Sequence, residues 1–129
     1  MSTSLLGLED PITMHQGNTA DIVYTLTDSS TEAAIDLMDA IIRFQVRKSY
    51  GASDWVINGT IANNKIVIVD AAAGKFKLHL EPGDTSSIKF DSANPDSFEG
   101  VYDIEVVTTT YGTQKPFYGT FTLNREVTR

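Results

Sequence analysis

Hydrophobic and polar positions alternate with a period of two along many short segments of this chain. In segment 41–48, apolar Ile42, Phe44 and Val46 are separated by polar residues. Successive side chains of a strand point to opposite faces, so this rhythm predicts a half-buried antiparallel strand. The same pattern predicts four further inward-facing sets: Ile22, Tyr24 and Leu26; Phe76, Leu78 and Leu80; Tyr102, Ile104 and Val106, with Asp103 and Glu105 outward; and Phe117, Phe121 and Leu123 with Gly119.

Turn-forming residues separate these segments, and no long stretch carries the 3.6-residue period of a helix. Residues 91–97 are rich in turn formers and predict a mobile loop. Asp84 is a candidate N-cap for one helical turn. Residues 55–57 predict a short strand, and two dipeptides predict hairpin turns: Asn58-Gly59 and Asn63-Asn64.

The segment pattern predicts one all-β domain. About seven to nine short strands without intervening helices are typical of a sandwich or barrel, and we expect an antiparallel immunoglobulin-like β-sandwich. A chain of 129 residues has the usual size of one domain. We assign residues 1–10 to an N-terminal arm, 11–124 to the sandwich and 125–129 to a C-terminal tail.

Composition narrows the possible functions. The chain has no cysteine, which excludes disulfides and thiolate metal sites. Its net charge of −7 argues against a nucleic-acid partner, because such proteins need positive surface. No apolar run reaches the roughly 20 residues of a membrane helix, and the N-terminus lacks the basic start of a signal peptide. We therefore expect no membrane partner and synthesis in a cytoplasm without secretion.

Catalytic chemistry is hard to find in the sequence. The two histidines, His15 and His79, could join a metal site only with carboxylates brought together by the fold. We favour the alternative that both are ordinary polar residues on strand faces. No nucleophile–base spacing or phosphate-binding loop stands out. We expect no enzyme activity, no catalytic residues, no metal and no cofactor.

Basic side chains form one candidate binding feature. If their strands share a sheet, five residues form a basic stripe for an acidic partner: Arg43, Arg47, Lys48, Lys75 and Lys77. We favour the alternative of a solvated face, balanced by acidic residues on adjacent strands.

Apolar residues outside the strand pattern form the other candidate contacts. Trp55 is either an exposed aromatic anchor or a plug at one end of the core, and the sequence supports both equally. The arm carries Leu5, Leu6 and Leu8, which pack either on a partner, our preference, or on the domain itself. Phe98, in a loop spanning 91–99, is a further candidate contact.

Eight segments, in this order, carry a family resemblance: ITMHQGNT (12–19), YTLTD (24–28), IDL (35–37), IIRFQVR (41–47), SYG (49–51), AGKF (73–76), GVYDIE (100–105) and GTFTL (119–123). The set resembles small immunoglobulin-like proteins encoded among the tail genes of tailed bacteriophages. It is similar to the N-terminal domain of phage baseplate upper proteins, over roughly residues 12–129. Each segment is weak alone, and the ordered set is more specific.

Two departures from the family pattern concern turns. Met38-Asp39 replaces a Thr-Gly pair of the family, so the turn is expected to be rebuilt, since glycine suits positive φ. Loop 91–99 is longer than usual and is a candidate for a contact specific to one virion.

The resemblance implies a structural role in a virion, in the tail, the baseplate or fibre attachment. The implied partners are other virion proteins in a symmetric assembly of many copies. One alternative is a capsid decoration protein of the phage head. Another is a carbohydrate-binding module for host adsorption, with three aromatic residues as stacking platforms: Trp55, Tyr50 and Tyr111.

Overall fold

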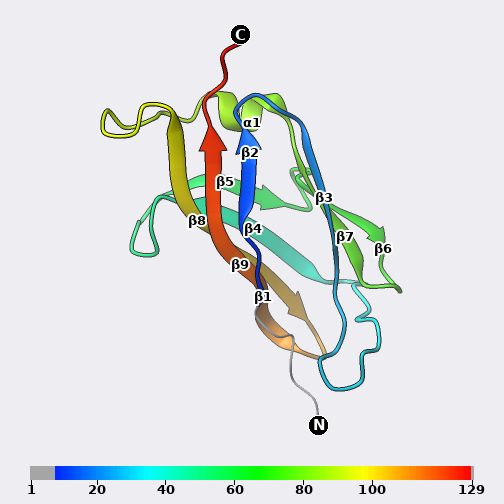
Figure 1. Cartoon of the computed structure of the whole chain (residues 1–129). Coiled ribbons are helices and arrows are strands. Elements are labelled where there is room, and N and C mark those ends of the chain that lie inside the picture. The colour runs from blue at the N-terminus through cyan, green and yellow to red at the C-terminus, as the bar shows by residue number, and fades with distance from the viewer. Residues whose placement is uncertain (1–7, 129) are drawn as a thin grey trace.

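The computed structural model describes residues 8–128, which form two β-sheets packed face to face (Figure 1). Sheet A has the order β1-β9-β8-β4-β5, with β2 also paired to β9, and sheet B has the order β3-β7-β6. The strands of sheet A are β1 (Leu8–Glu9), β2 (Ile12–His15), β4 (Ile41–Arg47), β5 (Trp55–Thr60), β8 (Ser97–Thr108) and β9 (Gly112–Asn124); those of sheet B are β3 (Ala20–Thr25), β6 (Ile66–Asp70) and β7 (Lys75–Leu80). A short helix, α1 (Pro82–Ser86), joins β7 to β8.

This topology is that of an immunoglobulin-like sandwich, as the sequence predicts. The order β9-β8-β4-β5 opposite β3-β7-β6 matches the two sheets of variable-type immunoglobulin domains. β1 and β2 run parallel to β9, whereas the pairs between β4, β5, β8 and β9 are antiparallel. The first strands therefore complete sheet A and leave β3 at an edge of sheet B.

The core lies between the sheets and follows the predicted alternation. Phe44, Phe76 and Phe121 are fully buried, and Tyr24 packs on Phe117 with ring centroids 4.6 Å apart. Every predicted inward residue is buried except Ile22, which is partly exposed. The alternation sets the faces because a slip of one residue would turn each apolar set toward water.

Buried side-chain hydrogen bonds hold one end of the sandwich. Gln16, at the end of β2, donates from Nε2 to the carbonyl oxygens of Thr85 (3.2 Å) and Ile88 (3.4 Å). The backbone N–H of Gly17 donates to Thr85 Oγ1 at 2.9 Å. Figure 1 shows α1 beside the end of β2, where these bonds form. They give polar backbone groups of α1 partners inside the protein.

A second buried anchor holds the opposite end. Tyr111, between β8 and β9, donates its hydroxyl proton to Asp28 Oδ2 at 2.6 Å, which raises the pKa of Tyr111. Asp28 Oδ1 accepts the backbone N–H groups of Ser30 (2.8 Å) and Thr31 (3.2 Å). Nearby, Gly74 has φ +70°, and a Cβ there would lie 2.5 Å from the Leu26 carbonyl oxygen. These residues fix the loop between β3 and β4 to the rest of the domain.

One of the two predicted hairpin turns is wrong. Asn58 and Gly59 lie inside β5, and the turn follows at residues 61–64 around Asn63-Asn64. Gly59 pairs with Phe44, and a Cβ there would lie 3.2 Å from Lys65 Cβ, so the glycine allows close packing within the strand. The packing of Gly59 on Lys65 and the pairing of β5 with β4 therefore outweigh the tendency of the Asn-Gly pair to form a turn.

Three other local predictions need correction or refinement. α1 forms where expected, but Glu81 is its N-cap, and Asp84 Oδ2 accepts the Glu81 N–H at 2.7 Å. Asp39, at the turn that was expected to be rebuilt, adopts a positive φ of 62° without a glycine. Phe98 lies within β8 rather than in a loop, and only 7% of it is exposed. It belongs to the core because it continues the inward register of Tyr102.

Candidate binding site

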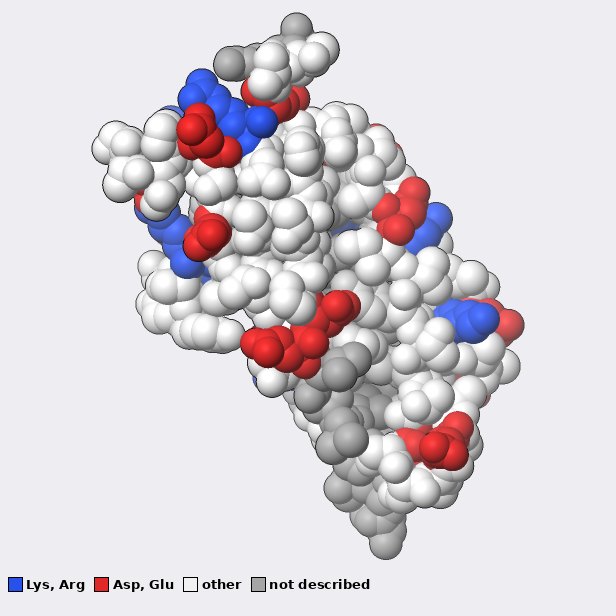
Figure 2. Space-filling model, viewed as in Figure 1, with Lys and Arg blue, Asp and Glu red and all other residues white. Residues whose placement is uncertain are grey.

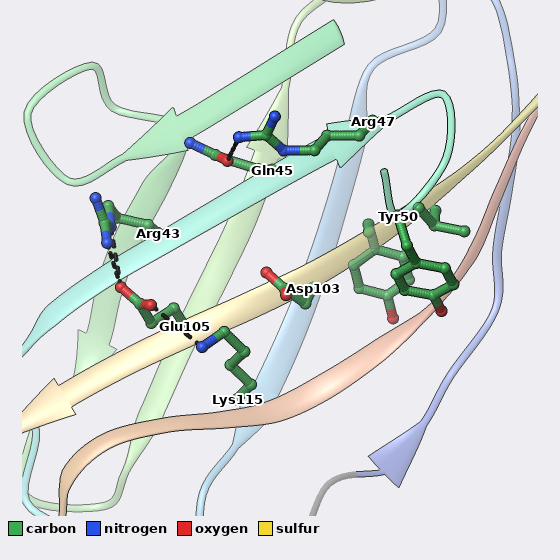
Figure 3. A pocket seen from close by; sticks show the side chains of 9 residues that line it. Arg43, Gln45, Arg47, Tyr50, Asp103, Glu105 and Lys115 are labelled. Atoms are coloured by element: carbon green, nitrogen blue, oxygen red, sulfur yellow. Dashed lines mark hydrogen bonds and ion pairs between the residues drawn. The ribbon is translucent and has the colours of Figure 1, made fainter. Parts of the chain in front are cut away.

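A hollow of about 390 Å³ lies on the outer face of sheet A (Figure 3). β4, β8 and β9 supply most of its lining, because their outward residues face the same side of the sheet. We call this feature the sheet A hollow, and it is lined by Arg43, Gln45, Arg47, Tyr50, Val101, Tyr102, Asp103, Glu105 and Lys115. Its walls are mostly polar and charged side chains.

One wall is an ion-pair network centred on Glu105. The Arg43 guanidinium donates to Glu105 Oε1 through both Nε (3.1 Å) and Nη2, and Lys115 Nζ lies 3.5 Å from Oε2. The Arg43 bonds, with help from Lys115, hold the pKa of Glu105 below its ordinary value. Both cations of this wall therefore already have an acidic partner.

The other wall is a chain of hydrogen bonds across β4 and β5. Arg47 donates to the Ala52 carbonyl oxygen (2.9 Å) and to Gln45 Oε1 (3.0 Å). Gln45 donates from Nε2 to Asn58 Oδ1 at 2.9 Å. These bonds fix the orientation of planar polar groups before any ligand arrives, which lowers the entropy lost on binding.

Asp103 stands between the two walls. In register it lies between Gln45 of β4 and Tyr118 of β9. Within residues 8–128 its carboxylate accepts no hydrogen bond and forms no ion pair, and Figure 3 shows it without an interaction line. Partial burial raises its pKa, although Lys115, Arg47 and Arg43 act in the opposite direction. Its oxygens are not fully buried, so the carboxylate can accept a hydrogen bond from outside the domain.

Two exposed aromatic residues flank this end of sheet A. Tyr50, in the loop after β4, lines the hollow and is 77% exposed. Trp55 begins β5 opposite Arg47 and is 53% exposed, so it is a surface residue rather than a core plug. Tyr111 lies at the other end of β4 and binds Asp28 through its hydroxyl. The three proposed stacking residues therefore do not form one platform.

The predicted basic stripe does not exist. Arg43 and Arg47 share the outer face of β4 in sheet A, whereas Lys75 and Lys77 lie on β7 in sheet B. Lys48 pairs with Asp91 at 3.2 Å, and Lys77 pairs with Asp21 at 3.6 Å. In the view of Figure 2, each group of basic atoms has acidic atoms close by. The alternative of balanced charges across neighbouring strands describes these faces.

The remaining interface candidates fall in different places. Leu5 and Leu6 lie outside the described residues. Leu8 is in β1, where its backbone pairs with Phe117 of β9. Phe98, buried in the core, leaves little surface for a contact. The sequence named Tyr50 as a candidate stacking platform and Asp103 only as an outward strand residue, and it gave no sign that the two line the same hollow.

The outer face of sheet B carries the histidine with the clearest contacts. His79 Nδ1 lies 2.6 Å from Asp21 Oδ1, and Nε2 lies 2.6 Å from Glu81 Oε1. The bonds to Asp21 and Glu81 raise the pKa of His79. Within the described part of the chain, no group of three or more potential metal ligands gathers. No helix there is long and apolar enough to cross a membrane.

Comparisons with known proteins find distant likenesses only. No family model matches the sequence, and no curated protein matches it. The structure is similar to the N-terminal domain of phage TP901-1 ORF48, with a TM-score of 0.44 and 12% identity over 95% of this chain and 96% of that chain. It is also similar to the Ig1 domain of mouse SynCAM 2, with a TM-score of 0.41 and 15% identity over 91% and 93% of the two chains. At these values neither likeness indicates what this chain binds.

Proposed function

We propose that this chain is a non-enzymatic structural component of a bacteriophage virion. Its place is the tail, baseplate or fibre attachment, where it acts as an adaptor through contacts with other virion proteins. The sequence resemblance is the starting point. The fold gives a structural role to several of the segments that carry this resemblance.

The observation that carries the proposal is the structural use of the resembling segments. Segment 12–19 contains Gln16, which binds α1, and segment 24–28 contains Asp28, which binds Tyr111. Segment 73–76 contains Gly74, which passes close to the Leu26 carbonyl. These residues are distinctive because they anchor both ends of the sandwich. These three segments therefore supply residues that build a rigid scaffold, whereas segments 41–47, 49–51 and 100–105 supply most of the lining of the sheet A hollow.

A rigid scaffold suits repeated use in a particle. β3, β5 and β6 lie at sheet edges, where backbone groups can pair with another chain. In a symmetric assembly, weak contacts of this kind act together, so that each can be modest while the whole is stable.

Mass spectrometry of particles purified from the host that carries this gene tests the proposal. We expect the chain to copurify with particles and, after separation of heads from tails, to remain with tails. Recovery with heads alone would favour a decoration protein of the capsid. Absence from particles would contradict a virion role altogether.

A variant without residues 1–7 tests the predicted partner contact of the arm. This truncation spares β1 and Asp10, whose carbonyl oxygen accepts the Tyr102 hydroxyl and whose N–H binds the Tyr118 carbonyl oxygen at 2.8 Å. We expect a folded domain with weaker incorporation into particles. Normal incorporation would remove the arm from the proposed interface.

A further inference from the structure

We propose that the sheet A hollow binds neutral carbohydrate, with vicinal hydroxyl groups donating to Asp103 and a sugar ring lying against Tyr50. This activity goes beyond the scaffold role, and it gives the virion component a contact of its own with a glycan surface. Four features of the site support it.

The first feature is the balance of donors and acceptors. The cationic groups of the hollow already have acceptors: Arg43 and Lys115 on Glu105, and Arg47 on Ala52 and Gln45. Among the acidic lining residues, only Asp103 receives no hydrogen bond from the described part of the protein. A carboxylate can accept several hydrogen bonds through its two oxygens. The Asp103 carboxylate is therefore available to a hydrogen-bond donor of a ligand, and the hollow is large enough to admit one.

The second feature is the charge of the lining, which decides between kinds of donor. Arg43, Arg47 and Lys115 face only Asp103 and Glu105, so cations already outnumber carboxylates in the hollow. A further ammonium or guanidinium group would be repelled by these three neighbours. Neutral hydroxyl groups supply donors without adding positive charge. This balance favours a neutral ligand over a basic side chain of a partner protein.

The third feature is an aromatic surface beside the acceptor. Tyr50 exposes most of its surface at the rim, and Figure 3 places it near the Asp103 end of the hollow. The C–H faces of sugars pack on aromatic rings while their hydroxyl groups bind polar side chains, and an amphipathic ring such as Tyr suits this position. Val101 adds apolar surface to the lining.

The fourth feature is the preorganised, polar character of the walls. The cores of protein interfaces are depleted of charged residues, whereas this hollow is lined largely by them. Its volume of about 390 Å³ lies in the range of small-molecule sites. A polyhydroxylated ligand of one or two rings fits both properties better than a flat protein surface does.

A glycan array, followed by nuclear magnetic resonance titration with the best neutral sugar, tests the proposal. Two site variants, Asp103→Asn and Tyr50→Ala, are compared with Asp96→Asn, an exposed acidic residue outside the hollow. Asp103→Asn keeps the shape of the side chain and breaks no hydrogen bond of the folded domain. Amide spectra verify the fold of each variant.

We expect saturable binding of at least one neutral glycan, with amide shifts centred on Asp103 and Tyr50. Asp103→Asn should weaken it at least about tenfold, since a hydrogen bond to a charged acceptor is lost, and Asp96→Asn should leave it unchanged. Absence of any neutral hit, or a hit that survives both site variants, would overturn the proposal. Binding of anionic glycans alone would also overturn it. Site variants that disturb particle assembly without any glycan binding would identify a protein contact instead.

The virion role has a separate outcome. Presence of the chain in purified particles together with a blank array would reject the sugar site and leave the structural role intact. Glycan binding by a chain that is absent from purified particles would support the sugar site and reject the structural role in the virion.

Discussion

The outer faces of the two sheets follow the same alternation of residues and yet differ in how their charges are satisfied. On sheet B, His79 is held between Asp21 and Glu81, and Lys77 lies 3.6 Å from Asp21. On sheet A, Glu105 pairs with both Arg43 and Lys115, and within residues 8–128 Asp103 forms no hydrogen bond or ion pair. On sheet B, Lys77 and His79 thus have acidic partners, whereas on sheet A the Asp103 carboxylate faces the hollow without a hydrogen bond from the described part of the chain.

This difference indicates that the register between neighbouring strands, rather than the number of charged residues on them, determines where the candidate site forms. Arg43 lies directly opposite Glu105, whereas Asp103 lies opposite uncharged Gln45 and Tyr118. Lys115, Arg47 and Arg43 act on Asp103 through space, but none of them lies opposite it in register to form an ion pair. A partly buried charge without a partner lowers stability, and such positions are concentrated at functional sites.

Phe44→Ala breaks the scaffold that supports both faces and has the largest expected effect. Phe44 is fully buried and packs against Tyr102 and Phe121, with ring centroids 5.6 and 6.5 Å away. We expect a loss of about 3–5 kcal/mol in the free energy of unfolding, because a large cavity forms in the core. Denaturant unfolding measures this loss. Unchanged stability would mean that β4 does not face the core as described.

Asp103→Asn tests whether the ionised carboxylate in the sheet A hollow lowers the stability of the folded domain. The pKa of Asp103 is raised by burial, so the ionised carboxylate disfavours the folded state above that pKa. We expect the variant to be more stable than the wild type at neutral pH, by less than about 1 kcal/mol because solvent screens the charge. The gain should shrink as the pH falls through the raised pKa toward 3.8, the ordinary value for Asp, where both states become protonated.

Urea unfolding of the two proteins at several pH values measures this difference. The control is Asp96→Asn, for which we expect no stability gain. A loss of stability in Asp103→Asn would indicate that the carboxylate has a stabilising partner and that the hollow is already filled.

A double-mutant cycle on Arg43 and Glu105 tests the paired wall of the same face. The two residues are joined by hydrogen bonds on a solvent-exposed surface. We expect a coupling energy of about 0.2–1 kcal/mol that decreases with added salt. Unfolding of Arg43→Ala, Glu105→Ala and the double variant measures it. Zero coupling at low salt would show that this wall is not preorganised.

His79→Gln tests the paired face of sheet B and has the smallest expected effect. The folded-state pKa of His79 is raised above 6.5 by Asp21 and Glu81, so protonated His79 stabilises the fold. This contribution is complete below 6.5 and is lost as the pH rises through the raised pKa. Melting temperatures across that window should fall more for the wild type than for the variant. Parallel profiles would contradict the assigned contacts.

The sequence predicted the core and sheet faces well because alternation is local. Phe44, Leu78 and Ile104 are buried as their segments require. Gly59 was misread because the Asn-Gly pair carries no signal of its packing on Lys65, just before β6, or of its pairing with Phe44 of β4. Phe98 was misread because the loop before β8 is shorter than its turn-forming residues suggest.

The candidate site was predictable only in part. Arg43, Asp103 and Glu105 were recognised as outward residues, but which of them pair depends on the register between β4 and β8. The basic stripe stayed an open alternative because no local signal indicates whether β4 and β7 share a sheet, and the structure places them in different sheets. Charge pairing between distant segments has no local signal, so only the structure shows that Asp103 faces the hollow without an ion-pair partner among residues 8–128.

The most direct test of the account compares particles that carry Asp103→Asn with particles that carry His79→Gln, by their adsorption to host cells. We predict that both variant chains are incorporated and that adsorption decreases only with Asp103→Asn, because only the face of sheet A recognises a ligand. Equal adsorption of the two particles, or a loss confined to His79→Gln, would contradict the distinction between the two faces.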